Sequence, residues 1–483
     1  MTLLAASASA FSTLGVGVLL LLALGFRGRS LGRREASIFE ALALAWLFGC
    51  GGLSFLYLSA ELAGVSVHRL FPFARGIGLL AACGAAVWIG ALARNRTGVS
   101  VERRSWAVRG GLVLLALGTV VTLALAVSTP MHYWDERFLW AFKAKVIFHE
   151  GGVFNASFLD PDRYHHFRSY PLLVPFAEAH AALSLGNFDD AAIKFIFPLF
   201  FVALGAIFHA AVRRHSTETT ALCFTLYLVL LPAQMIRSDA EGGSWLSGYA
   251  DIPLAAYAFA AFVASERFLT GGDTRWLRAS ALLLAMAVFT KREGALFAAT
   301  LITFWVFLVV RGRLSLGGLS TAGLCFALPL LAFLVFLAGV PADAHLPDSS
   351  YLELLRGADF STLFDRPEIA RRFFGSLLSP RWGFAGLLTL ATFGLGVGAA
   401  GKGAVRAVAP LLLYALVPAA AYLLAYHMTP YREQWHLDVS LNRLQSHFIP
   451  LPVYSSAILL TAGVGHDPVR EEAAGGEHVH AGR

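Results

Sequence analysis

Charged residues are scarce in this sequence, and the scarcity excludes an ordinary soluble fold. Asp, Glu, Lys and Arg make up only 14% of the 483 residues, whereas hydrophobic residues make up 57%. A soluble domain carries about 25% charged residues. Apolar runs of roughly 18–24 residues recur along most of the chain, and each is long enough to cross about 30 Å of hydrocarbon. The composition therefore predicts an all-α polytopic membrane protein.

Cysteines are few, and the motifs of soluble enzymes are missing. The four cysteines all fall in apolar runs and show no metal-type spacing, so a disulfide framework is not expected. The sequence contains no P-loop, no complete Rossmann fingerprint and no His-Glu-x-x-His zinc signature. The net charge of +7 comes from basic residues in short turns between apolar runs, where membrane topology explains them. We expect no cofactor, no metal and no nucleic-acid partner.

The apolar runs define the predicted domain organisation. About 13 of them are candidate transmembrane helices, with an uncertainty of one or two. We divide the chain into N-terminal spans (1–128) that are partly accessory, a catalytic membrane region (129–465) and a cytoplasmic tail (466–483) whose polar composition predicts disorder. Residues 171–187 are too short for a span and are expected to form an interfacial or half-membrane helix. The candidate spans cover residues 4–26, 36–58, 70–93, 107–128, 190–212, 219–236, 249–268, 277–290, 294–310, 316–340, 383–400, 406–426 and 446–464.

Basic residues occur in those turns that would share one side of the membrane. The positive-inside rule places this side in the cytoplasm, which puts the N-terminus outside and the C-terminal tail inside a cell inner (plasma) membrane. The loops 128–170 and 341–382 then face the extracytoplasmic side. Because nucleotide sugars and ATP are scarce there, chemistry at this face has to use an activated group carried by a lipid. The basic turns contain Arg27, Arg29, Arg33, Arg34, Arg94, Arg96, Arg103, Arg104, Arg109, Arg213, Arg214, Arg267, Arg275, Arg278, Arg311, Arg313, Lys402 and Arg406.

The stretch Met131–Gly152 follows an apolar run directly and contains Trp134-Asp135-Glu136 near its start. The spacing of its apolar residues predicts a short amphipathic helix at the membrane surface, and its terminal Gly-Gly pair provides a C-terminal stop. A carboxylate held at the edge of the bilayer is suited to accept a proton from an acceptor hydroxyl. The alternative for Asp135 is an N-cap of this helix, a role that Asp fulfils well.

Two further segments on the same face bring polar groups back to the membrane. The motif YHHFRSYP carries Arg168 and Tyr170, and its alternative interpretation is an interfacial belt of aromatic and basic residues. The motif SDAEGGSWLSGYADIP contains Tyr249 and places Asp251 just inside the next apolar run. A carboxylate at that depth is costly unless it is paired or functional. The alternative here is an ordinary loop with a helix-capping Asp.

The motif FTKREGALF places three consecutive charges, Lys291-Arg292-Glu293, between two apolar runs. Such charges need a polar cavity or the aqueous interface. Lys291 and Arg292 are candidates to hold a phosphate while Glu293 fixes their orientation. The alternative is a tight, solvated turn between two short helices.

The motif YHMTPYREQWHLDVSLNRL precedes the last span. Helical spacing places Arg432, Trp435, His436 and Arg443 near one face. This combination fits an anionic head group held by cations, with an aromatic ring to stack on a sugar. The alternative is an interfacial helix with snorkelling arginines.

The strings WDERFLWAFKAK, YPLLVPF, GYADIPL, TKREG and WHLDVSLNRL resemble those of the GT-C superfamily of membrane glycosyltransferases. That superfamily includes the protein O-mannosyltransferases and the aminoarabinose transferases that act on lipid A. The resemblance runs from about Thr129 to Leu451. It implies a GT-C-like helical bundle with extracytoplasmic loops and interfacial helices. It also implies a polyprenyl-phosphate-linked sugar donor, transfer with inversion, and a first-loop acid as the base, which maps onto Asp135. The chain departs from the family pattern because three further spans precede this acid.

These observations predict a glycosyltransferase that moves a sugar from a polyprenyl-phosphate donor to a hydroxyl of an envelope glycan, lipid or protein. One alternative is a transporter or lipid-binding membrane protein, in which polar groups would line the whole path. Another is an O-antigen-ligase-like enzyme that uses a diphosphate-linked glycan and does not require the Trp-Asp-Glu element. The predicted site comprises the catalytic Asp135 and Glu136, the phosphate-binding Arg432, Arg443, Lys291, Arg292 and His436, and the substrate-binding Trp134, Tyr170, Arg168, Tyr249, Asp251, Glu293 and Trp435.

Overall fold

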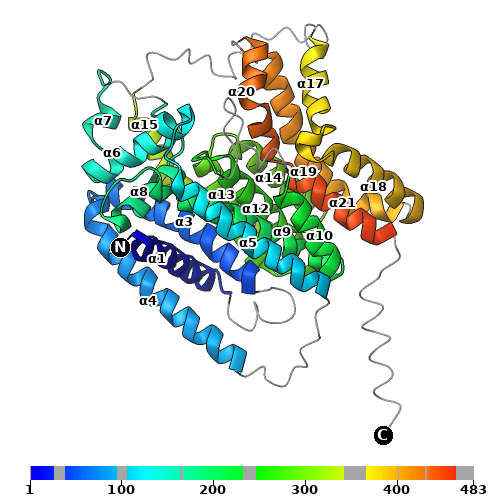
Figure 1. The fold of residues 1–483 in the computed structure, drawn as a ribbon, viewed down its shortest axis with the longest axis horizontal. Helices are drawn as coiled ribbons and strands as arrows, with labels where there is room; N and C mark the ends of the chain where they lie inside the picture. The colour runs from blue at the N-terminus through cyan, green and yellow to red at the C-terminus, as the bar shows by residue number, and fades with distance from the viewer. Residues whose placement is uncertain are drawn as a thin grey trace.

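A computed structural model describes the chain in eight ranges, and within them every regular element is a helix. Long helices lie side by side in a slanted bundle, and α17 and α20 rise from one edge of it (Figure 1). The predicted disordered tail, residues 342–365 of the second long loop and residues 164–166 of the YHHFRSYP motif lie outside the described residues. The described ranges are 2–26, 38–94, 106–163, 167–231, 246–341, 366–400, 402–429 and 432–463.

Each of the predicted spans corresponds to a helix. In the described part of the chain, eight helices, counting α9 with the short turn before it, are long and apolar enough to cross a membrane: α1, α3, α4, α5, α9, α12, α15 and α19. The all-helical membrane fold is therefore confirmed in the described residues, whereas the number of about 13 spans remains a prediction. The bounds are α1 (Thr2–Ala23), α3 (Ile38–Leu62), α4 (Val67–Arg94), α5 (Trp106–Ser128), α9 (Ile196–His215), α10 (Glu218–Val229), α12 (Asp251–Gly271), α13 (Thr274–Thr290), α14 (Gly294–Val310), α15 (Leu316–Gly339), α18 (Ala385–Ala400), α19 (Lys402–His427) and α21 (Pro450–Gly463).

Shorter helices fill the connections at one end of the bundle. The piece predicted as an interfacial or half-membrane helix forms α8, and nearly all of its side chains are buried. The first long loop contains η1, α6 and α7, and the last polar motif forms α20. The bounds are η1 (Asp135–Ala141), α6 (Phe142–Glu150), α7 (Ala156–Leu159), α8 (Leu173–Leu185), η2 (Ala192–Phe195), α17 (Pro367–Leu377), η4 (Pro380–Trp382) and α20 (Glu433–Ser446).

The amphipathic helix predicted for Met131–Gly152 is two helices joined end to end. It begins with the π-helical turn η1 and continues as α6, and the predicted stop is confirmed because Gly151 ends α6 with φ at 79°. Asp135 is not the N-cap, since Trp134 occupies that position and makes no side-chain cap hydrogen bond. The capping alternative for Asp135 is therefore wrong. π-Helical turns are rare and are frequently found at functional sites.

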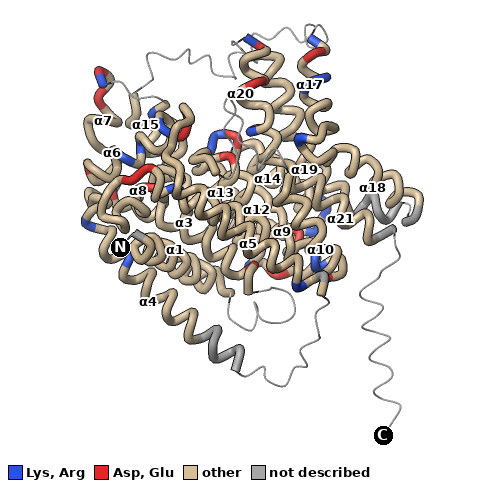
Figure 2. Tube along the Cα trace, in the orientation of Figure 1, with Lys and Arg blue, Asp and Glu red and all other residues tan. Residues whose placement is uncertain are grey.

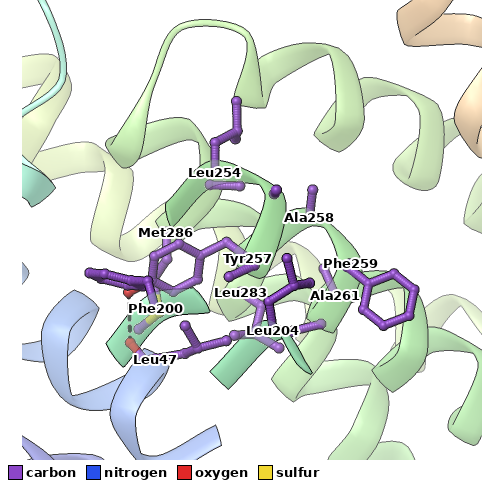
Figure 3. Close-up of a cluster of buried hydrophobic side chains, with 14 of the residues drawn as sticks. Leu47, Phe200, Leu204, Leu254, Tyr257, Ala258, Phe259, Ala261, Leu283 and Met286 are labelled. Atoms are coloured by element: carbon purple, nitrogen blue, oxygen red, sulfur yellow. Dashed lines mark hydrogen bonds between the residues drawn. The ribbon is translucent and has the colours of Figure 1, made fainter. Parts of the chain in front are cut away.

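Helix α12 is the central element of the bundle, and apolar side chains surround it on all sides. The hydroxyl of Tyr257 donates to the carbonyl oxygen of Leu47 on α3 at 2.7 Å. Phe200 of α9 and Met286 of α13 lie around the same ring (Figure 3). Because α12 is enclosed in this way, its first residue, Asp251, is held inside the protein.

The three N-terminal helices pack with close backbone contact because small residues line their seams. A Cβ atom at Gly17 of α1 would lie 1.7 Å from the carbonyl oxygen of Ala45 on α3. A Cβ atom at Gly15 would lie equally close to the carbonyl oxygen of Gly78 on α4. Any side chain at these positions would push the helices apart.

The N-terminal helices also hold the first long loop. The carboxylate of Glu61, at the end of α3, accepts from the backbone N–H of Val153 at 2.5 Å. The backbone N–H of Val67, at the start of α4, donates to the carbonyl oxygen of Gly151 at 2.7 Å. The segment predicted to be partly accessory therefore fixes the end of α6, and through α6 it supports η1.

Charged residues concentrate toward the two ends of the bundle, and the helix centres are largely uncharged (Figure 2). At one end Arg214 and Arg267 both pair with the buried Glu40, at 3.2 and 3.0 Å. Asp251 lies at the other end of α12, 16 residues from Arg267, which corresponds to about 24 Å of helix. The basic turns that contain these two arginines therefore share one end. Which end faces the cytoplasm remains a prediction.

Candidate active site

Four segments that are far apart in the sequence meet at the end of the bundle where α12 begins. They are η1 of the first loop, the start of α12, the turn between α13 and α14, and the last part of α20. The segment before α12 approaches η1 closely, since a Cβ atom at Gly248 would lie 3.3 Å from Cγ of Glu136. Gly272, with φ at 69°, ends α12, and the side chain of Asp273 then caps α13. This tight turn sends α13 back along α12, so that α13 ends beside Asp251.

Asp251 is the centre of the site. Its carboxylate is completely buried, and its Oδ1 atom lies 2.7 Å from Nζ of Lys291 and 2.7 Å from Nε2 of His447. Its Oδ2 atom accepts from Nε of Arg443 at 3.2 Å. The other ring nitrogen of His447 lies 2.9 Å from the hydroxyl of Tyr422. A buried carboxylate needs such compensation, because removal of its charge from water is costly.

Arg443 connects the buried Asp251 to the more accessible Asp135. Its Nη2 atom donates to Oδ2 of Asp135 at 2.6 Å, and its guanidinium carbon lies 4.3 Å from the ring centroid of Tyr249. The side chain of Asp135 is 22% exposed, against 12% for Arg443. The result is a chain of charges that begins near the surface at Asp135 and runs inward.

The chain of charges continues from Asp251 to Lys291 and then to Glu293. The Oε1 atom of Glu293 lies 3.1 Å from Nζ of Lys291. Burial alone would lower the pKa of Lys291, but the carboxylates of Asp251 and Glu293 raise it above its ordinary value. Lys291 therefore stays charged. The five groups with full charges give a formal net charge of −1, from three carboxylates (Asp135, Asp251, Glu293) and two cations (Arg443, Lys291). Both cations are thus already paired with carboxylates, although the sequence predicted them as ligands for a donor phosphate.

Arg292 is the exposed cation beside this network. Its Nη2 atom donates to Oγ of Ser169 at 2.5 Å, and its guanidinium carbon lies 4.4 Å from the ring centroid of Tyr170. Among the described residues no carboxylate pairs with Arg292. Tyr170 thus orients an exposed arginine, whose role in binding phosphate remains a prediction.

The three remaining residues from the predicted α20 motif lie outside the chain of charges. Arg432 is exposed at the start of α20, and the side chain of Trp435 is 53% exposed. His436 packs against Tyr426, with ring centroids 4.9 Å apart. Burial and the nearby Arg443 lower the pKa of His436 to about 4. The lowered pKa disfavours the charged imidazole at neutral pH, and the role of His436 at the donor phosphate stays a prediction.

Glu136 has a structural role in place of the predicted catalytic one. Its side chain is completely buried, and Oε2 accepts from the backbone N–H groups of His132 and Tyr133 at 2.9 and 3.0 Å. Oε1 accepts from the backbone N–H of Gly248 at 2.6 Å and lies 3.9 Å from Nζ of Lys194. Glu136 therefore ties η1 to the segment before α12 and holds Asp135 in position.

Arg168 also has a structural role. It was predicted to bind substrate, but its buried guanidinium donates to the backbone carbonyl oxygens of Phe158, Asp160 and Arg163 in its own loop. Trp134, in contrast, is 46% exposed beside Asp135 and packs near Phe138 and Phe167.

Sequence reasoning missed two polar residues close to the site. His447, which binds Asp251, falls inside the range assigned to the last span, and a histidine at the start of an apolar run was the available signal. Lys143 is buried, donates to the carbonyl oxygen of Phe167 at 2.6 Å and lies 5.5 Å from the ring centroid of Tyr170. A lysine within the aromatic string FLWAFKAK was the corresponding signal.

Comparison with known proteins identifies no relative of this chain. It matches no protein-family model, no curated protein and no solved structure. Among the described residues no group of three or more His, Cys, Asp or Glu side chains is arranged as metal ligands.

Proposed function

We propose that this protein is a GT-C-type glycosyltransferase that moves a sugar from a polyprenyl-phosphate donor to a hydroxyl of an envelope glycan, lipid or protein. The observation that carries the proposal is the position of Asp135. It is a partly exposed carboxylate at the start of a π-helical turn, and a buried chain of charges lies behind it. The exposed Arg292 lies beside the same chain of charges.

In the proposed reaction Asp135 is the catalytic base. It accepts the proton of the acceptor hydroxyl while that oxygen attacks the anomeric carbon of the donor sugar. A new bond forms between the acceptor oxygen and the anomeric carbon, and the bond from that carbon to the phosphate oxygen breaks. The electron pair of the broken bond leaves with the polyprenyl phosphate. Attack opposite the leaving group inverts the configuration at the anomeric carbon.

The leaving phosphate gains negative charge during this step, and cations near the site stabilise it. Arg292 is the first choice, because it is exposed and already oriented by Ser169 and Tyr170. Arg443 is the second, because its guanidinium lies against Asp135 itself. The exposed ring of Trp134 offers an apolar face on which a sugar can stack.

The distribution of charge favours an enzyme over a transporter. A transport path needs polar groups through the whole bundle. Between Asp251 and the Glu40–Arg267 pair, the buried residues of α12 from Ile252 to Ala264 are apolar apart from the hydroxyl of Tyr257. We therefore propose chemistry at one end, which we assign to the extracytoplasmic face of the inner membrane.

The experiment that tests this function is mass spectrometry of envelope glycans, lipids and glycoproteins from cells that produce the wild-type protein or Asp135→Asn. Loss of one glycosyl addition in the variant, with normal protein levels, would support the proposal and identify the sugar. Asp438→Asn is the matched control, because Asp438 is a half-exposed acid that pairs with Arg372 and not with the chain of charges. Identical glycans in all three strains would contradict the proposal. Identical glycans would be expected of an O-antigen-ligase-like enzyme, which does not require Asp135. Such an enzyme would instead lose activity in Arg443→Gln.

A further inference from the structure

We propose that Arg443 moves from Asp135 to the phosphate of the lipid donor, so that donor binding itself releases the base. This inference rests on the proposed function and adds a role for the ion pair between Arg443 and Asp135. The exchange makes and breaks hydrogen bonds only, and no covalent bond changes. It also identifies the ligand at this position as a phosphate monoester or diester at the end of an apolar chain.

The two carboxylates that hold Arg443 are not equivalent. Asp251 retains two further partners, Lys291 and His447, each at 2.7 Å. Asp135 has Arg443 as the only hydrogen-bond or ion-pair partner of its carboxylate among the described residues. When a competing anion arrives, Asp251 thus stays compensated and Asp135 is the carboxylate that is set free.

The exposed fractions of the three side chains also indicate that Asp135 is the carboxylate that a donor phosphate would displace. Exposed fractions fall from 22% for the side chain of Asp135 to 12% for Arg443 and zero for Asp251. An anion that approaches from the surface therefore meets the Nη2 side of the guanidinium first. Nε remains directed at Asp251 and keeps Arg443 anchored. Two guanidinium nitrogens on one edge can bind two phosphate oxygens at once, which a lysine cannot do.

The exchange would couple the base to the presence of donor. Arg443 occupies Oδ2 of Asp135 while the site lacks donor. Once the phosphate has taken Arg443, this oxygen is open to the proton of the acceptor hydroxyl.

The test is the affinity of the purified full-length protein for polyprenyl monophosphate that carries no sugar. Asp135 competes with the phosphate for Arg443, so Asp135→Asn should bind this lipid about tenfold more tightly than the wild type does. Asp438→Asn removes the same charge at the same end of the protein and should leave the affinity unchanged. Arg443→Gln should weaken binding about tenfold or more, and Arg443→Lys, which keeps the charge, should restore part of it.

Equal or weaker binding of the lipid phosphate by Asp135→Asn would overturn the inference. A similar gain in affinity for the uncharged polyprenol would do the same, since the effect would then not depend on the phosphate. The assay contains neither sugar nor acceptor, so its outcome is independent of transfer. Asp135→Asn could bind the lipid phosphate more tightly while the wild type shows no sugar transfer in a separate transfer assay. That pair of results would support the exchange and reject the glycosyltransferase proposal.

Discussion

The Nη2 atom of Arg443 lies 2.6 Å from Oδ2 of Asp135, although 308 residues separate them in the chain. This contact joins the first extracytoplasmic loop of the predicted topology to the helix before the last span. It also defines the state of the candidate base, because Asp135 is held by a cation that is itself anchored on the buried Asp251.

Asp251→Asn should lower the free energy of unfolding by about 3–5 kcal/mol, because it leaves the buried Lys291 and the partly buried Arg443 without their shared carboxylate. The measurement is thermal unfolding of the protein in detergent. Asp438→Asn is again the control, since the side chain of Asp438 is 46% exposed. Equal unfolding midpoints for the two variants would show that Asp251 is not the anchor described above.

Replacement of the two buried glutamates Glu136 and Glu178 should affect the stability of the protein differently. Glu136→Gln should destabilise the protein by about 1–3 kcal/mol, because Glu136 accepts three backbone N–H groups. Glu178 on α8 is equally buried, but neither carboxylate oxygen has a hydrogen-bond partner among the described residues. Glu178→Leu should therefore preserve or raise the unfolding midpoint. A large loss of stability in Glu178→Leu would contradict this assignment.

His436 should make the protein less stable in acid. Its pKa in the folded protein, about 4, lies below the ordinary value near 6.5. The unfolded chain therefore binds a proton between about pH 6.5 and pH 4 that the folded protein does not. The stability contribution is complete above this window and is lost as the pH falls through it. In unfolding measurements across this range His436→Gln should reduce the slope of stability against pH, and an unchanged slope would contradict the assignment.

Gly17→Val should separate α1 from α3 and lower the unfolding midpoint strongly. The new Cβ atom would lie 1.7 Å from a backbone oxygen, and backbone cannot be displaced as a flexible side chain can. Gly84→Val on α4 is the control, because a Cβ atom there meets nothing within 4 Å. If the two variants unfold at the same temperature, the close packing of the N-terminal helices is not a source of stability.

Local patterns were sufficient to place the helices and to group the charged motifs. Apolar runs positioned the long helices because length and composition decide which segments can cross a membrane, and the basic turns of α9 and α12 do share one end. The pairing within the site could not be predicted, because it depends on contacts such as Arg443–Asp135. The two neighbouring acids illustrate the difference, since only the structure separates the buried Glu136 from the partly exposed Asp135.

The most direct test of Asp135 as the catalytic base is the initial rate of sugar transfer in proteoliposomes that contain a polyprenyl-phosphate-linked sugar and a hydroxyl acceptor. A general base contributes about 10²–10⁴ in rate. We predict that Asp135→Asn lowers the rate by at least about 100-fold, whereas Asp438→Asn transfers at the wild-type rate. Transfer by Asp135→Asn at the wild-type rate would show that Asp135 is not the catalytic base.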